Sequence, residues 1–172
     1  MRDRTLSVQE FQAPDSPILI AASLCVALLL NWLPWQGIWL EFRPDFLALA
    51  LLYWCTHKPL QVGIGIAWML GILADVADAS FIGQHAIAYS VLAFCGILLH
   101  RRLLMFNLLQ QTLQIFPLLL LAYAVYAVVY WLLRGIIVWE YFLGSILTAL
   151  LWAPMSILVR TLRPSRSVSD RL

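Results

Sequence analysis

The sequence predicts an all-α integral membrane protein with six transmembrane helices and with both termini in the cytoplasm. Three observations carry this prediction. Of the 172 residues, 63% are hydrophobic and only 12% are charged, whereas a soluble domain usually carries about 25% charged residues. Six apolar stretches follow one another, and the basic residues gather in alternate loops. A water-soluble fold of this size could not hide so much apolar surface, so we expect lipid around most of the chain.

The apolar stretches set the domain organisation. A helix needs roughly 20 apolar residues to cross a bilayer, with a usual lower limit near 17. The stretches that approach this length are 17–33, 46–56, 60–74, 86–99, 115–133 and 141–159. We therefore expect a cytoplasmic N-terminal segment (1–16), a six-helix transmembrane domain (17–159) and a basic cytoplasmic tail (160–172).

The first stretch is interpreted as a retained span, with a cleaved signal peptide as the alternative. It follows a mixed-charge segment that contains Asp3, Glu10 and Asp15. It ends in Asn31-Trp32-Leu33-Pro34-Trp35, which is not the small-x-small pattern of a cleavage site. These two features favour a span that stays in the protein.

The second stretch, 46–56, is short, since eleven residues rise only about 16 Å as a helix. Its approach is polar and contains Arg43, Pro44 and Asp45. Pro44 suits the first turn of a helix, where no backbone N–H is needed. The stretch is either a tilted span with a polar entrance or a half-span that re-enters.

Charge placement favours six crossings. Lys and Arg in short loops mark the cytoplasmic side. With the N-terminus inside, nine of the eleven basic residues lie inside and two, Arg43 and Arg134, lie outside. The nine are Arg2, Arg4, Lys58, Arg101, Arg102, Arg160, Arg163, Arg166 and Arg171. Without the second crossing, most of these would move outside. Arg160, Arg163 and Arg166 of the tail are expected to face anionic lipid.

The third stretch carries a stripe of small residues. Gly63, Ala67 and Gly71 recur every four residues and share one helix face. Small residues let helix backbones approach closely in lipid. The stripe predicts a close helix–helix contact, either within the bundle or with another protein.

Ionisable residues follow the same stretch. Asp75 and Asp78 lie at its predicted outer end, and His85 is ten residues beyond Asp75. An ionisable group at membrane depth is a functional hypothesis by default, so a proton or cation relay is one interpretation. In the other, Asp78 is solvated and Asp75 bonds nearby backbone, with His85 able to pair with it across the turn. A metal site would have too few ligands here.

The fifth stretch carries Tyr123, Tyr126 and Tyr130 at i, i+3 and i+7, and Arg134 follows one turn later. The tyrosines either face a cavity or pack in the bundle, and packing is the simpler interpretation.

The motifs of common enzymes are missing from the sequence. There is no Walker A loop, no HExxH and no GxSxG. Cys25, Cys55 and Cys95 lie in apolar runs without a CxxC pair, which indicates neither disulfides nor a metal site. The net charge of +2 is too small to suggest nucleic acid. We expect no catalytic residues and no cofactor.

Short motifs in order along the chain resemble the MreD family of rod shape-determining proteins. Phe42-Arg43-Pro44-Asp45-Phe46, leading into Leu51-Leu52-Tyr53-Trp54, is similar to the family's polar, Pro-started second span. Gly71-Ile72-Leu73-Ala74-Asp75, then Gly83 and Gln84-His85-Ala86, resembles its Gly-x-x-x-Asp segment and the turn after it. Asp78-Ala79 departs from the commoner small residue plus Gly, which affects the turn's backbone geometry and not the assignment.

The resemblance implies a non-enzymatic scaffold of the bacterial inner membrane that binds the bitopic protein MreC. Through MreC it would help organise MreB filaments, the glycan polymerase and the elongation transpeptidase in peripheral peptidoglycan synthesis, and so support rod shape. It also implies a fold similar to the substrate-binding subunits of energy-coupling-factor transporters, although fold alone does not give function.

Two sets of candidate residues follow. Gly63, Ala67, Gly71, Asp75 and Gly83 are candidates for partner or helix packing, and Arg43, Pro44, Asp45, Asp78 and His85 for a polar outer surface. The alternative function is a small-molecule, vitamin-type binding subunit of a transporter. It requires a polar cavity open to the outside and lined by groups such as Asp75, His85 and the tyrosines.

Overall fold

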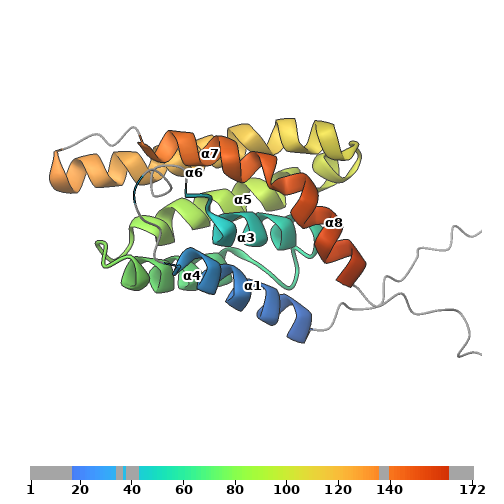
Figure 1. The fold of residues 1–172 in the computed structure, drawn as a ribbon, viewed down its shortest axis with the longest axis horizontal. Coiled ribbons are helices and arrows are strands. Elements are labelled where there is room, and N and C mark those ends of the chain that lie inside the picture. Colours follow the sequence, from blue (N-terminus) through green and yellow to red (C-terminus); the bar gives the residue numbers. More distant parts are fainter. Residues whose placement is uncertain (1–16, 34–36, 38–42, 136–139, 163–172) are drawn as a thin grey trace, which may run out of the picture.

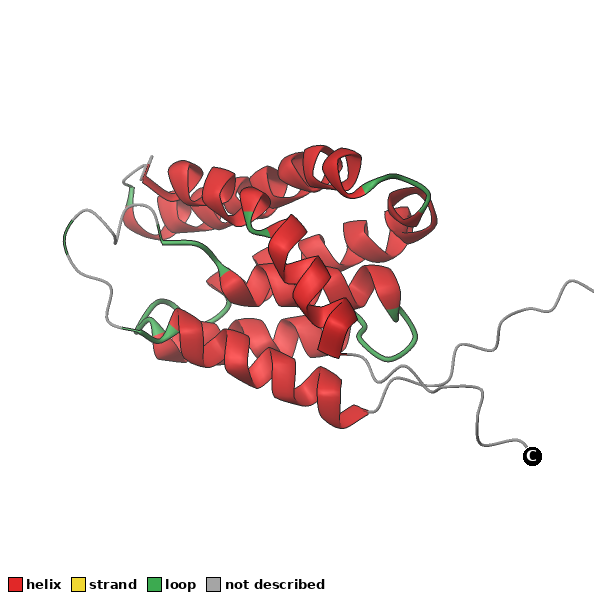
Figure 2. Cartoon of the chain, turned by 45° about the vertical axis from the view of Figure 1, so that its right-hand side comes forward, coloured by secondary structure: helices red, strands yellow, loops and turns green. Residues whose placement is uncertain are grey.

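The computed structural model describes residues 17–33, 37, 43–135 and 140–162, and these form a bundle of helices joined by turns (Figure 1). No strand occurs within those ranges (Figure 2). The helices are α1 (Pro17–Asn31), α3 (Phe46–His57), α4 (Ile64–Ala77), α5 (Gln84–Leu104), α6 (Leu108–Arg134), α7 (Glu140–Leu150) and α8 (Trp152–Leu162). The bounding segments 1–16 and 163–172 lie outside the described residues.

Each of the first five apolar stretches corresponds to one helix and the sixth to two, and the helices differ in length from the stretches. α5 and α6 extend into the polar residues that flank their apolar runs, and α5 ends in a turn that contains Arg101 and Arg102. A helix satisfies its backbone N–H and C=O groups internally. It can therefore continue past the end of an apolar run, until a residue in the sequence terminates it. α6 is stopped by Gly135, whose φ of 71° is left-handed and closes the helix.

Two of the described helices, α5 and α6, are long and apolar enough to cross a membrane. The pair α7 and α8 is a third candidate if it is counted as one bent span. α1, α3 and α4 are apolar but shorter, with 15, 12 and 14 residues. The chain is an all-α membrane protein on this description.

The predicted sixth stretch is broken, because α7 and α8 meet at an angle of 41°. Pro154 lies in the first turn of α8. Proline has no N–H, and its ring clashes with the carbonyl four residues earlier, which here belongs to Leu150 at the end of α7. Pro154 therefore removes a hydrogen bond at the break, where α8 turns away from the direction of α7 (Figure 1).

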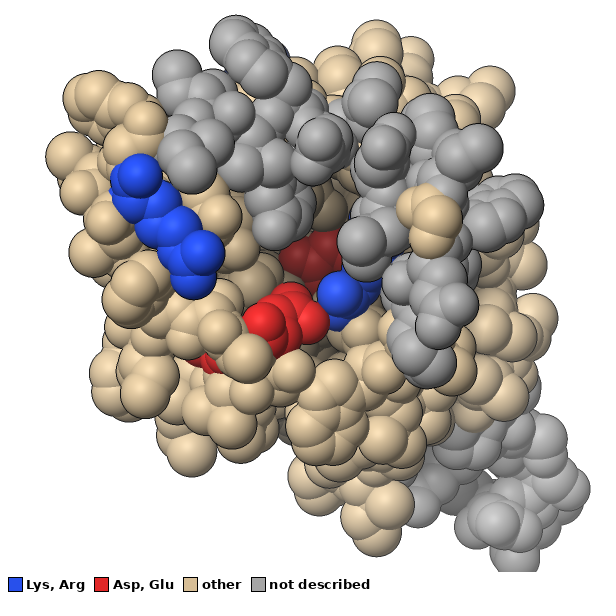
Figure 3. Space-filling view, turned by 60° about the vertical axis from the view of Figure 1, so that its left-hand side comes forward, with Lys and Arg blue, Asp and Glu red and all other residues tan. Residues whose placement is uncertain are grey.

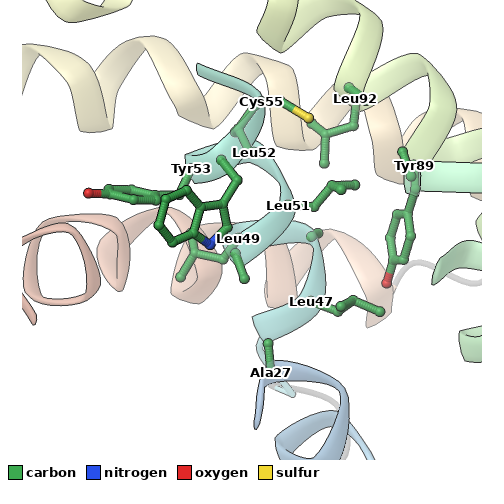
Figure 4. Packing of buried hydrophobic residues seen from close by; sticks show 14 of the residues in the cluster. Ala27, Leu47, Leu49, Leu51, Leu52, Tyr53, Cys55, Tyr89 and Leu92 are labelled. Carbon is green, nitrogen blue, oxygen red and sulfur yellow. The ribbon is translucent and has the colours of Figure 1, made fainter. Parts of the chain in front are cut away.

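α3 forms the centre of the bundle. All ten residues from Leu47 to Thr56 are buried, and they pack against residues of the neighbouring helices such as Ala27 of α1 and Leu92 of α5 (Figure 4). The Trp54 indole nitrogen donates a hydrogen bond of 2.8 Å to the Ser23 hydroxyl of α1. α3 therefore touches protein on every side, which explains why no polar face appears in its sequence.

The small-residue stripe of α4 packs inside the bundle. Ala67 is fully buried, and a Cβ added to Gly71 would overlap the backbone of Ala86 in α5. Gly63 differs, since it caps the start of α4 and a Cβ there would meet nothing within 4 Å. Of the two partners left open by the sequence, α5 occupies the face that carries Ala67 and Gly71.

Candidate functional site

A polar pocket of about 500 Å³ opens at one end of the bundle. Here α1, α4 and α6 end and α3, α5 and α7 begin. Figure 3 shows acidic and basic side chains gathered around a hollow on this face. We call it the helix-end pocket. Its walls carry the charged or polar residues Asn31, Arg43, Asp45, Asp78, Ser80, His85, Tyr89, Tyr123, Tyr126, Tyr130 and Arg134.

Asp45 joins three helices at the floor of the pocket. As the N-cap of α3, its Oδ1 accepts a bond of 2.9 Å from the Ala48 backbone N–H, which satisfies a donor that a helix start leaves free. The same oxygen accepts from the Asn31 amide of α1 at 2.9 Å. Oδ2 accepts from the Tyr89 hydroxyl of α5 at 2.8 Å. The carboxylate thus has partners at both oxygens.

Two further bonds strengthen this junction. The side-chain oxygen of Asn31, Oδ1, accepts a hydrogen bond from the Phe46 backbone N–H at 2.9 Å. The Asp45 backbone N–H donates to the Thr148 hydroxyl of α7 at 3.0 Å. Because residues from α1, α3, α5 and α7 share one network, the floor of the pocket is rigidly placed.

Arg43 and Asp78 form an ion pair on the pocket wall. Both terminal guanidinium nitrogens lie 3.2 Å from Asp78 Oδ1, and one of them also donates to the Asn31 backbone carbonyl. The backbone carbonyl of Arg43 packs closely against Gly144 of α7. A Cβ added to Gly144 would lie 2.8 Å from the Arg43 carbonyl oxygen. The pair links the segment before α3 to the turn after α4.

Asp75 is fully buried and organises the turn between α4 and α5. Its Oδ2 accepts from the Gly83 backbone N–H at 2.7 Å. Its Oδ1 accepts from the Ser80 hydroxyl at 3.0 Å and from the His85 backbone N–H at 2.8 Å. These are the bonds to nearby backbone that one sequence interpretation expected, and they account for a carboxylate at this depth.

The same carboxylate orients His85. The Nδ1 atom of His85 lies 2.8 Å from Asp75 Oδ1, so the pairing across the turn is present. A carboxylate only accepts hydrogen bonds, so we assign the proton to Nδ1. Nε2 is thereby directed towards Asp78, whose Oδ2 is 3.9 Å away.

The turn itself has an unusual backbone. Ala79 has a φ of 48°, and it is the only non-glycine residue with a positive φ among those described. Left-handed backbone is costly for residues with a Cβ, so Ala79 holds a conformation that glycine would adopt more easily. Gly83, with a φ of 110°, supplies the second left-handed position and caps α5.

Aromatic side chains form the opposite wall. Tyr126 of α6 lies against the His85 ring at 4.6 Å and stacks on Tyr130 at 6.3 Å. The Arg134 guanidinium lies 5.5 Å from the Tyr130 ring and 5.3 Å from the Phe81 ring. All three tyrosines of α6 line the pocket. Tyr126 is also buried, and Tyr123 packs against the hydrophobic core, so the stripe both faces a cavity and packs in the bundle.

The pocket unites part of the sequence candidates. The residues that line it are Arg43, Pro44, Asp45, Asp78 and His85. Asp75 and Gly83 do not line it, but Asp75 bonds both Gly83 and the pocket residue His85. Ala67 and Gly71 of α4, and Gly63 at its N-cap, do not line the pocket. In the basic tail, Arg160 is exposed at the end of α8, and Arg163 and Arg166 lie outside the described residues.

Sequence reasoning missed Asn31, Tyr89 and Thr148. Tyr89 carried a usable signal, since it is four residues after His85 and shares its helix face. Asn31 is a single amide at the end of an apolar run, and Thr148 is a hydroxyl within one. Nothing local marks either as a partner of Asp45. No group of three potential metal ligands occurs in the described part of the chain.

The comparisons with known proteins agree on one family. The sequence model of the rod shape-determining protein MreD family matches residues 15–162. A Haemophilus influenzae protein named rod shape-determining protein MreD is 30% identical over 148 residues, which cover 84% of this chain and 90% of that protein. No solved structure matches this one significantly.

Proposed function

The chain belongs to the MreD family of rod shape-determining proteins, and we propose that it is a non-enzymatic scaffold of the bacterial inner membrane. In this proposal it crosses the membrane six times, binds MreC, and through MreC helps position MreB filaments, the glycan polymerase and the elongation transpeptidase. The observation that carries the proposal is the family match over nearly the whole helical part of the chain.

Six crossings with both ends inside are supported by the helix directions. The Asn31–Asp45 bond places the end of α1 beside the start of α3, and the Arg43–Asp78 pair places the end of α4 there too. α3 and α4 therefore run in opposite directions. Of the six described Lys and Arg residues, only Arg43 and Arg134 lie at the pocket end, which makes it the outer end under the positive-inside rule.

The short helices do not argue against this threading. α3 has 12 residues and rises about 18 Å, less than the hydrocarbon thickness of roughly 30 Å. It is enclosed by other helices, however, and its ends meet polar protein groups such as Asp45 and Lys58. A helix that touches protein on all sides need not match the lipid by itself.

The packing of α4 narrows the place for MreC. The Ala67 and Gly71 face is filled by α5, so the single span of MreC must bind another face of the bundle. The outward side of α4 carries exposed apolar residues, among them Trp68, Met69 and Leu73. Gly65 lies on that side, and a Cβ there would meet nothing within 4 Å.

The test is genetic and biochemical. In a rod-shaped bacterium depleted of its own MreD protein, the full chain should restore rod shape and co-purify with MreC. A reporter fused after Leu172 should be active in the cytoplasm. Round cells and an absence of MreC from the purified sample, at normal membrane levels of the chain, would refute the scaffold role.

The helix-end pocket favours a second function, a vitamin-type binding subunit of a transporter. The polar cavity that this function requires is present, and His85 and the tyrosines line it. A thermal-shift assay of the purified chain against a panel of vitamins separates the two functions. Stabilisation by one vitamin together with failure to restore rod shape would favour the transporter subunit.

A further inference from the structure

The helix-end pocket has the size of a ligand site, and scaffolding alone gives it no occupant. Its volume of about 500 Å³ lies within the roughly 300–1,000 Å³ of small-molecule sites. We propose that it binds a small zwitterion, a molecule that carries an ammonium group and a phosphate or carboxylate group a few bonds apart.

The balance of charge on the walls selects this class. Among the described residues, two arginines, Arg43 and Arg134, and two aspartates, Asp45 and Asp78, line the pocket, so the formal charges of these four cancel. A pure anion would meet two carboxylates, and a pure cation would meet two guanidinium groups. A zwitterion places each of its charges against the opposite one.

The end that receives the anionic group is Arg134. Among the described side chains, no carboxylate lies within ion-pair distance of its guanidinium. Its guanidinium carbon lies over the Phe81 and Tyr130 rings, and these contacts restrict the side chain where it lines the pocket. The fork of N–H groups of a guanidinium suits a planar or tetrahedral anion.

The end that receives the ammonium group is Asp78. Its Oδ1 carries both hydrogen bonds from Arg43. Its Oδ2 is 3.9 Å from His85 Nε2, beyond hydrogen-bond distance, and so has room for a further donor. The rings of Tyr126 and Tyr130 lie on the facing wall, and aromatic faces attract ammonium groups.

The walls are set before any ligand arrives. Asp75 hydrogen-bonds to the backbone N–H and the Nδ1 atom of His85. Asp45 hydrogen-bonds to the side chains of Tyr89 and Asn31. Because these groups already have their partners, little conformational freedom is lost on binding, which favours affinity. Ligand binding here is independent of the scaffold role, since no step of it requires MreC.

Two sources supply this chemistry. One is the headgroup of a zwitterionic phospholipid, phosphoethanolamine, at the level where the helices end. The other is a free zwitterion such as an amino acid. Both present an ammonium and an anion at short separation, and the experiment separates them.

The test uses the full chain in nanodiscs of phosphatidylglycerol, titrated calorimetrically. The probes are glycerophosphoethanolamine and a set of free amino acids, with glycerol phosphate and ethanolamine as single-charge analogues. We expect at least one zwitterion to bind at least tenfold more tightly than either analogue. Equal affinity for an analogue, or no binding of any zwitterion, would overturn the proposal.

Variants locate the binding. Asp78→Asn and Arg134→Gln should each weaken the zwitterion at least tenfold, whereas Arg134→Lys should weaken it less because the charge remains. Arg101→Gln, an exposed change at the far end of α5, is the matched control and should bind as the wild type. Asp78 and Arg134 are exposed, so both variants should fold, and thermal melting checks this. Unchanged binding in both would also overturn the proposal.

A second arm fixes the source. Native mass spectrometry of the chain from nanodiscs that contain phosphatidylethanolamine should show a retained lipid that both variants lose, if the headgroup is the ligand. Retention of no lipid alongside tight binding of an amino acid would support the same site with a free ligand. A neutral vitamin that binds where zwitterions do not would refute it.

Discussion

The centre of the bundle and its pocket end are held together by different forces. Around α3 most contacts are apolar, and every residue from Leu47 to Thr56 is buried. At the pocket end, side chains of α1, α3, α5 and α7 meet through hydrogen bonds centred on Asp45. In lipid the hydrophobic effect does not drive helices together, so the centre of the bundle depends on van der Waals packing between close-fitting side chains. The end depends on satisfied polar groups and is open to a ligand.

The largest effect should come from filling the α4–α5 contact. Gly71→Leu places atoms where the Ala86 backbone already lies, and backbone cannot move aside as a side chain can. We expect a loss above about 3 kcal/mol, beyond the usual range for overpacking, and little folded protein in detergent by size-exclusion chromatography. Cells should become round.

The matched control for that variant is Gly65→Leu in the same helix. A Cβ at Gly65 meets nothing within 4 Å, so this chain should fold normally. If Gly71→Leu also folded normally and lost only MreC, the α4–α5 contact described above would be wrong, and the stripe would be a partner face.

The next largest effect should come from a cavity at α3. Trp54 is fully buried and bonded to Ser23, so Trp54→Ala should cost about 3–5 kcal/mol. Trp68 is exposed on the outside of α4, and Trp68→Ala should cost less than about 1 kcal/mol. Denaturant titration in mixed micelles compares the two, and equal losses would contradict a tightly packed centre.

A moderate effect should follow from Asp75→Asn at the pocket end. The carboxylate of Asp75 accepts hydrogen bonds from the Gly83 N–H and from His85. The asparagine amide has the same shape, but its NH₂ group would face one of these two donors, and that hydrogen bond would be lost. Hydrogen bonds to charged groups contribute about 1.5–3 kcal/mol, and we expect a loss in that range by thermal melting. Faster amide exchange confined to residues 78–85 should accompany it, whereas exchange spread over α3 would show that the two regions are not separate.

The smallest effect should come from Arg43→Lys. Arg43 and Asp78 have side-chain exposures of 24% and 31%, and partly exposed ion pairs contribute about 0.2–1 kcal/mol. The lysine keeps the charge and loses the two-nitrogen contact. If Arg43→Lys lowered the melting temperature more than Asp75→Asn, the Arg43–Asp78 ion pair would contribute more to stability than the Asp75 hydrogen bonds, contrary to this prediction.

Particular residues show how far the sequence could predict this site. The sequence predicts a polar surface that contains five residues next to apolar runs, and all five line the pocket: Arg43, Pro44, Asp45, Asp78 and His85. Asn31 and Thr148 were missed because their bonds to Asp45 span 14 and 103 positions. A pattern along one helix shows which side chains share a face and says nothing about the group opposite.

The sequence by itself determined that the chain is helical and membrane-embedded, because in lipid a backbone of this composition must satisfy its own polar groups. It also determined which polar residues lie at helix ends, since apolar runs stop there. Only the tertiary structure decided that Gly71 meets Ala86, that the tyrosines of α6 face a cavity, and that two arginines and two aspartates share it. These depend on how the other six described helices, which differ in length, fit around α3, and that fit depends on all the side chains together.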